Sequence, residues 1–132
     1  MAAEMNHHTP LSIRAPFARY SHAVEVPAGH RLVLCSGQLS ITLDDHIPET
    51  AEAQTELCFA NVSAILEAAG MGLADIVRIN AYVTDRAHLP GYMKVRDRLF
   101  SDPAPASTLM IVSGFAREAF KVEIEVIAAA AE

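Results

Sequence analysis

The sequence predicts an α+β fold in which two helices pack on one face of a mixed β-sheet of about six strands. Two observations lead to this prediction. Several segments have apolar residues at every second position, as strands do, and two others repeat every three or four residues, as helices do. Their order is strand-rich, helix, strand, helix, strand, strand. The 132 residues suit a single domain, with residues 1–16 as a loosely held arm because they show no periodicity.

The first part of the chain is expected to form three short strands separated by turns. Proline, glycine and aspartate clusters separate the apolar runs, and the strands are placed at residues 20–26, 31–35 and 39–43. Gly37 follows the apolar run that ends at Cys35. A glycine there indicates a bulge or a place where a ligand approaches the backbone.

Two helices follow, with a strand between them at residues 76–84. The first covers residues 50–69, because Thr50 is a good N-cap and Gly70 a good C-terminal cap. The second begins after Asp85 and ends near residue 100. Its inner face is expected to hold Leu89, Tyr92, Val95 or Arg96, and Leu99.

The two C-terminal strands contain the candidate site. Residues 121–126 alternate polar and apolar side chains, which places Lys121, Glu123 and Glu125 on one face. We expect the strand at 108–112 to be the neighbour of 121–126. It is apolar on both faces, so we expect both of its faces to be covered. A partly desolvated carboxylate has a raised pKa and can hold a water or move a proton. Glu123 is the candidate; the alternatives are a solvated carboxylate or one paired with Lys121 or Arg78.

Composition excludes several classes of function. The net charge of −6 argues against a nucleic-acid partner, because binding the phosphate backbone requires a basic surface. No run of about 18 apolar residues is present, so no membrane span is expected. The first residues lack a signal peptide, which makes the cytoplasm the expected location. The 52% hydrophobic content indicates either an oligomer interface or a dense core.

Neither a metal nor a cofactor site is expected. The six histidines have no ligand spacing, and phosphate loops, dinucleotide fingerprints and nucleophile elbows are absent. Cys35 and Cys58 lie in apolar segments, so buried free thiols are favoured over a disulfide.

Several segments together resemble the RidA/YjgF family of reactive-intermediate deaminases. They are residues 16–20, 34–38, 54–70, 75–78, 105–106 and 122–125, and the similarity extends from about residue 15 to 129. The resemblance implies a chorismate-mutase-like fold and a homotrimer with ligand clefts between subunits. It also implies hydrolysis of enamines and imines to 2-keto acids and ammonia without a cofactor.

The resemblance assigns roles to particular residues. Tyr20 matches the family's cleft tyrosine, and Ser36 and Gly37 match the strand end that lines the cleft. Glu123 matches the glutamate that positions the hydrolytic water. These positions predict a small-molecule site in this chain.

Four other positions depart from the family. Ser107 stands where deaminating members have an arginine that binds the substrate carboxylate, and Leu109 stands where a cysteine is common. In the second helix, Met93 replaces a common asparagine and Arg96 a common tyrosine. Losing a bidentate arginine clamp costs about 2–4 kcal/mol of binding. A 2-imino acid should therefore bind poorly and a more apolar ligand better, unless Arg96, Arg78 or Arg19 supplies the charge.

Two functions remain in competition. The first is hydrolysis of enamines or imines that lack the usual carboxylate contact, with Glu123 holding the water. The second is a non-catalytic, small-ligand-binding trimer of the same fold. A ribonuclease activity, known for some members of the family, is disfavoured by the acidic composition.

Overall fold

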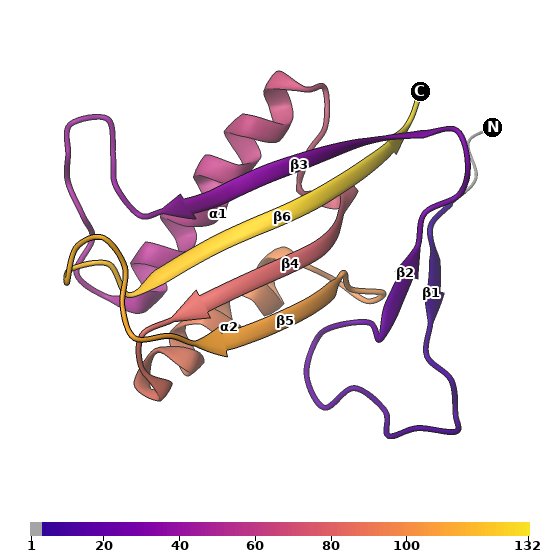
Figure 1. The fold of residues 1–132 in the computed structure, drawn as a ribbon, viewed down its shortest axis with the longest axis horizontal. Helices are drawn as coiled ribbons and strands as arrows, with labels where there is room; N and C mark the ends of the chain where they lie inside the picture. The colour runs from indigo at the N-terminus through magenta and orange to yellow at the C-terminus, as the bar shows by residue number, and fades with distance from the viewer. Residues whose placement is uncertain (1–3) are drawn as a thin grey trace.

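The computed structural model describes residues 4–132. Two helices lie on one side of a four-stranded mixed sheet, and a small two-stranded sheet stands beside it (Figure 1). The arrangement confirms the predicted α+β class. The elements are β1 (Asn6–His8), β2 (Ala23–Glu25), β3 (His30–Leu39), α1 (Ala51–Ala68), the 3-10 turn η1 (Leu73–Asp75), β4 (Ile76–Val83), the 3-10 turn η2 (Arg86–His88), α2 (Leu89–Leu99), β5 (Ala106–Ile111) and β6 (Val122–Ala131).

The strand order of the main sheet is β3-β6-β4-β5. β6 pairs antiparallel with β3 and with β4, whereas β4 and β5 are parallel because α2 connects them. The expectation that the two C-terminal strands are neighbours is therefore wrong: β4 lies between β5 and β6. Two parallel strands need a crossover connection between them. The α2 segment is that connection between β4 and β5, so β5 pairs with β4 and not with β6.

The six strands form two sheets, and two details near the N-terminus differ from the prediction. Residues 39–43 do not form a strand, because the chain leaves the sheet after Leu39 and turns, with the Asp45 amide donating to the Thr42 carbonyl at 3.0 Å. Conversely, β1 forms within the predicted arm by pairing with β2. Three residues without periodicity give no strand signal. The first three residues of that arm lie outside the described residues, and its flexibility stays a prediction.

Helix α1 is capped as the sequence predicts. The Thr50 hydroxyl accepts a hydrogen bond from the Ala53 amide at 3.1 Å, and Gly70 adopts a left-handed φ of +73° after the last turn. The buried Gln54 joins this helix to the start of β6: its amide nitrogen donates to the Ala119 carbonyl at 2.8 Å, and its carbonyl oxygen accepts from the Lys121 amide at 2.8 Å. These bonds set where β6 begins.

The second helical segment begins with the short turn η2, in which the Asp85 carboxylate accepts from the Ala87 amide at 2.8 Å. Helix α2 then presents Tyr92, Val95 and Arg96 as its buried residues. The helix therefore packs on the sheet with the face that the sequence predicts, and both predicted alternatives, Val95 and Arg96, are buried.

The core lies between the helices and the sheet. β6 contributes Val122, Ile124 and Val126, which are at most 2% exposed. Each such side chain contributes about 1.5–3 kcal/mol on burial. Cys35 and Cys58 are free and buried, as predicted; burial raises the pKa of the Cys58 thiol to about 12, so this thiol stays protonated.

β5 is one of the two edge strands of the main sheet. Its outer residues Met110 and Ile111 are 53% and 44% exposed, so the expectation that this strand is covered on both faces is wrong for a single chain. Of the helices described in residues 4–132, none has the length and apolar character needed to cross a bilayer.

Candidate functional site

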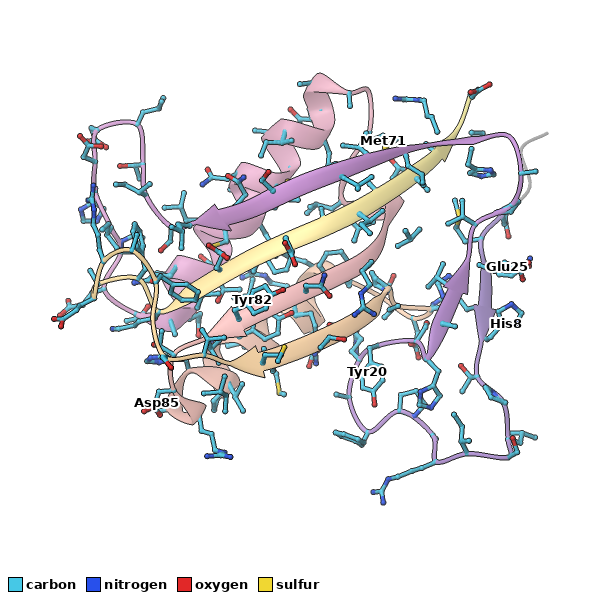
Figure 2. The ribbon with its side chains drawn as sticks, viewed as in Figure 1. His8, Tyr20, Glu25, Met71, Tyr82 and Asp85 are labelled. Atoms are coloured by element: carbon cyan, nitrogen blue, oxygen red, sulfur yellow. The ribbon has the colours of Figure 1, made fainter. Side chains whose placement is uncertain are left out.

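Glu123 lies on the open face of the sheet, opposite the helices. β6 is the strand between β3 and β4, and Glu123 pairs with Leu39 on one side and Tyr82 on the other. Figure 2 shows the Tyr82 side chain on β4 within this face. The alternation along β6 therefore places Glu123 where the sequence predicts, away from the apolar core.

The Glu123 carboxyl group lies against the backbone of β3 at Gly37. A Cβ atom built on Gly37 would stand 2.8 Å from the Glu123 Cδ atom and 2.9 Å from Oε2. The register of β3 shifts between Cys35 and Gln38, which confirms the predicted bulge at the glycine. Gly37 thus makes room for the carboxyl group, and the neighbouring Ser36 side chain is exposed beside it.

The surroundings of Glu123 favour its neutral form. Burial raises the pKa of this carboxyl group above its ordinary value, and the Glu125 charge raises the pKa further. Within the described residues, Glu123 has no salt bridge. The Lys121 ammonium donates instead to the Glu49 carbonyl, and Arg78 bonds to neighbours on β4 and β5. The alternative in which Glu123 pairs with Lys121 or Arg78 is therefore wrong.

Glu125 is held by a chain of hydrogen bonds across the open face. Its Oε1 atom accepts from the Tyr82 hydroxyl at 2.7 Å and from the Asn80 amide at 3.1 Å. Asn80 is oriented in turn by Arg78, whose Nε donates to the Asn80 Oδ1 atom at 3.0 Å, while the other end of the guanidinium donates to Thr108 at 2.6 Å. The chain fixes the second carboxylate close to the first.

Ser107 and Leu109 lie on the other face of the sheet, which the helices cover. Ser107 pairs with the buried Ile79 of β4, so both side chains point toward α2. Leu109 packs against the core in the same way. Burial raises the pKa of the adjacent Tyr92 to about 12, opposed by Arg96 and Ser107. Ser107, which stands at the position of the family's arginine, therefore faces α2.

Met93 and Arg96 of α2 lie on this helix-covered side as well. Met93 packs against the core. Arg96 is 4% exposed, its guanidinium lies 5.7 Å from the centre of the Tyr92 ring, and its Nε and Nη2 atoms donate to Asp97 Oδ1 at 3.1 and 3.0 Å. Arg96 is thus already paired.

Tyr20 lies in a third place, in the loop before β2 (Figure 2). Its ring packs edge-on against Phe17 and His22. The next residue, Ser21, bridges to Ala106 at the start of β5, with the Ser21 amide donating to the Pro105 carbonyl at 3.0 Å. Tyr20 lines a hollow of about 470 Å³ at this corner.

The predicted site residues therefore form three groups in one chain. Glu123, Ser36 and Gly37 form the open-face group. The helix-face group consists of Ser107, Leu109, Met93 and Arg96. Tyr20 stands alone at the corner near β5. Among the described residues, no three His, Cys, Asp or Glu side chains are grouped so as to hold a metal ion.

Sequence reasoning missed the partners of these residues. Asn80 and Tyr82 were visible as polar residues alternating along the strand at 76–84, but their contact with Glu125 depends on the register of β4 with β6. His7 was also missed: it lines the Tyr20 hollow, and it comes from β1, which has no sequence signal.

Comparison with known proteins places this chain in a family. The family model described as Endoribonuclease L-PSP matches residues 12–130. A 2-iminobutanoate/2-iminopropanoate deaminase from Dermatophagoides farinae is 30% identical over 121 residues, which are 90% of this chain and 91% of that protein. Protein DfrA from Myxococcus xanthus is 35% identical over 113 residues, or 83% of each chain.

Solved structures agree with these relatives. RidA from an Antarctic Psychrobacter superposes with a TM-score of 0.71 at 34% identity, covering 88% of this chain and 92% of its own. YyfB from Yersinia pestis, a Rid-family protein of unknown function, superposes with a TM-score of 0.82 over 96% of this chain and 98% of its own; at 24% identity it supports the fold alone. The chain therefore belongs to the RidA/YjgF family, to which the family model described as Endoribonuclease L-PSP corresponds.

Proposed function

We propose that this protein hydrolyses small enamines and imines that lack the carboxylate group of a 2-imino acid. The observation that supports this most strongly is the Glu123 carboxyl group, half-buried, without a cationic partner among the described residues, and seated against the bare backbone of Gly37. A carboxylate whose pKa is raised is a better proton acceptor than one in water.

The proposed step uses Glu123 as a general base. A water held by the carboxylate attacks the imine carbon, and its proton passes to Glu123. Glu123 passes this proton to the imine nitrogen, which gives a neutral carbinolamine. Glu123 then accepts the hydroxyl proton as the C=O bond forms and the C–N bond breaks, and it returns that proton to the leaving nitrogen, so that ammonia departs. The Glu125 charge, which Tyr82 and Asn80 hold in place, raises the pKa of Glu123 and so supports proton uptake.

The arginines in the structure support a substrate without a carboxylate. Arg96 donates to Asp97, and Arg78 donates to Asn80 and Thr108. Arg19 donates to the carbonyls of Asp97 and Phe100 at 3.1 and 3.0 Å. Each candidate for replacing the clamp at Ser107 therefore already has protein partners. The half-buried Leu109 and Met93 favour an apolar ligand.

The separation of the site residues supports an assembly of several copies. Tyr20, the open-face group and the helix-face group lie apart in one chain, so a cleft that uses all three needs more than one subunit. Exposed apolar residues on the outer strands, Leu32, Leu34, Met110 and Ile111, give such an assembly surface to bury. We propose the homotrimer that the family resemblance implies. Light scattering should then return three times the 14.2 kDa chain mass.

Turnover of neutral substrates tests the hydrolase. Ethyl 3-aminocrotonate, a stable primary enamine, and benzophenone imine are incubated with wild type, with Glu123→Gln and with Glu118→Gln, which alters an exposed loop glutamate. Ammonia release should fall by about 10²-fold or more in Glu123→Gln and stay at the wild-type rate in Glu118→Gln. Equal rates for wild type and Glu123→Gln would contradict the proposal.

The role of Ser107 is tested with 2-iminopropanoate generated in the assay. Wild type should hydrolyse it poorly, and Ser107→Arg should increase kcat/KM by about 10-fold or more, because a guanidinium clamp is worth about 2–4 kcal/mol. A thermal melt checks that the arginine is accommodated beside α2. A folded variant with no gain would show that carboxylate recognition is lost at other positions too.

A non-catalytic ligand-binding trimer is the second candidate. It is favoured by Ser107, which offers one neutral hydroxyl in place of a charged clamp. If wild type turns over neither neutral probe but a small molecule copurifies with it or stabilises it in a thermal-shift screen, this function is supported instead. Ribonuclease activity remains disfavoured by the net charge of −6.

A further inference from the structure

Three histidines near the N-terminus differ in which ring nitrogen is engaged. His8 Nε2 lies 2.7 Å from the Glu25 carboxylate, and both side chains point outward at the edge of the small sheet (Figure 2). His22 Nε2 lies 2.7 Å from the Arg14 carbonyl. His7 is engaged through its other nitrogen, with Nδ1 2.9 Å from the Ser21 hydroxyl. Among these three histidines, only His7 has an Nε2 atom without a hydrogen-bond partner within residues 4–132.

The Ser21 contact defines the tautomer of His7. The Ser21 hydroxyl has one proton, and it donates that proton to the Ala104 carbonyl at 2.5 Å, because a carbonyl can only accept. Ser21 must therefore accept from His7, so the neutral ring carries its proton on Nδ1. The Nε2 atom then has a free lone pair and can accept a proton.

The surroundings of Ser21 make this arrangement rigid. Ser21 is 6% exposed and Ala104 is fully buried, and the Ser21 backbone is bonded to Pro105 and bridged to Ala106. His7 is thereby anchored to the segment that leads directly into Ser107. A histidine held by a buried hydroxyl is positioned in the way that general bases commonly are.

His7 also faces open space. It lines the hollow of about 470 Å³ that contains Tyr20, together with Pro16 and Pro103, and it borders a second hollow of about 420 Å³ beside the ends of β4 and β6. The walls of the Tyr20 hollow are partly apolar and its size suits a small organic molecule. The residues before 12, His7 among them, lie outside the family match.

We infer that His7 Nε2 is a proton acceptor for the N–H group of an enamine bound beside Tyr20. The inference rests on the proposed function, because proton transfer to His7 would supply the imine that Glu123 hydrolyses. The N–H proton passes to Nε2, the nitrogen electron pair forms the C=N bond, and the C=C pair takes a proton from water at the β-carbon. The resulting hydroxide recovers the proton from the imidazolium, so the net change is conversion of enamine to imine.

Hydrogen exchange at the β-carbon tests this step separately from hydrolysis. In D₂O the vinyl proton of ethyl 3-aminocrotonate is followed by ¹H NMR, and wild type should accelerate its exchange. His7→Asn keeps a donor at the place of Nδ1 but removes Nε2, and should reduce the catalysed exchange by about 10-fold or more. His8→Asn, next to it on the exposed side of β1, should leave the rate unchanged.

Two further measurements protect the test from a folding defect. Added imidazole should restore exchange in His7→Ala, which a purely structural role would not allow. In ¹⁵N-labelled wild type, the His7 ring should show a protonated Nδ1 and a bare Nε2, and Ser21→Ala should remove that preference.

The outcomes separate the two proposals. Catalysed exchange without ammonia release would support the role of His7 and overturn the hydrolase. Ammonia release with equal exchange in wild type and His7→Asn, or a ring that carries its proton on Nε2, would overturn the role of His7.

Discussion

The two faces of β6 show how one strand serves two purposes. On the helix side, Ile124 is fully buried in the core. On the open side, Glu123 and Glu125 are half-buried carboxyl groups beside Tyr82. The apolar face gains stability from close packing, whereas on the open face burial and the neighbouring Glu125 disfavour the charged form of Glu123.

The difference indicates which changes should affect folding and which should affect chemistry. A side chain removed from the core leaves a cavity that the neighbours cannot fill. A carboxylate removed from the open face leaves the core intact and relieves a repulsion. Substitutions on the two faces should therefore separate loss of stability from loss of activity.

The largest effect is expected from Ile124→Ala on the core side. Truncating this fully buried side chain should lower the free energy of unfolding by about 2–5 kcal/mol. Leu43→Ala, at a fully exposed turn position, is the matched control and should change stability by less than about 0.5 kcal/mol. Urea denaturation measures both; similar losses would contradict the assignment of the core.

A smaller effect is expected from Gly37→Ala on the open side. The new methyl group would stand 2.8 Å from the Glu123 Cδ atom, so the carboxyl group must move, at a cost of about 1–3 kcal/mol. Enamine hydrolysis should fall at the same time. Gly114→Ala is the control, because a Cβ there meets nothing within 4 Å. A Gly37→Ala protein with unchanged turnover would show that the position of Glu123 is unimportant.

The pH dependence of stability should reveal the raised pKa of Glu123. Because its folded pKa lies above the ordinary value of 4.5, the native state binds this proton more tightly than the unfolded chain does. The stabilisation is complete below pH 4.5 and is lost as the pH rises through the folded pKa.

The measurement compares wild type with Glu123→Gln in urea at a series of pH values, so that other groups cancel. Wild type should lose stability relative to the variant as the pH rises above about 4.5. In Glu125→Gln the loss should be smaller, because the Glu125 charge is the second cause of the shift. If the stability of wild type relative to Glu123→Gln increases with pH instead, the raised pKa of Glu123 is contradicted.

The smallest effect is expected on the outer surface of the helix layer. Arg98 of α2 donates to Glu56 of α1 at 3.0 Å, and the two side chains are 59% and 44% exposed. A double-mutant cycle with alanine at both positions should give a coupling of about 0.2–1 kcal/mol that weakens in salt. A coupling above about 2 kcal/mol would show that this pair is more shielded than its exposure indicates.

Much of the fold could be predicted because it depends on local patterns. The period of α1 and its caps at Thr50 and Gly70, the alternation along β4 and β6, and the bulge at Gly37 each depend on a few adjacent residues. The strand β1 could not be predicted, because three residues carry no period and pair only through a distant partner.

The site was predictable in part. The choice of Glu123 came from its place on an alternating strand and from the resemblance, but its supports come from other strands. Tyr82 and Asn80 reach Glu125 through the register of β4, and His7 is anchored to Ser21 from 14 residues away. No spacing rule links these residues.

The sequence by itself determined the class of fold, the two helices and the two faces of β4 and β6, since side-chain periodicity follows from backbone geometry. It also determined the family. Only the tertiary structure decided that β4 separates β5 from β6, that Ser107 and Glu123 lie on opposite faces of the sheet, and that Glu123 has no cationic partner among the described residues. Strand order, register and solvent exposure depend on contacts between distant segments, which local patterns do not specify.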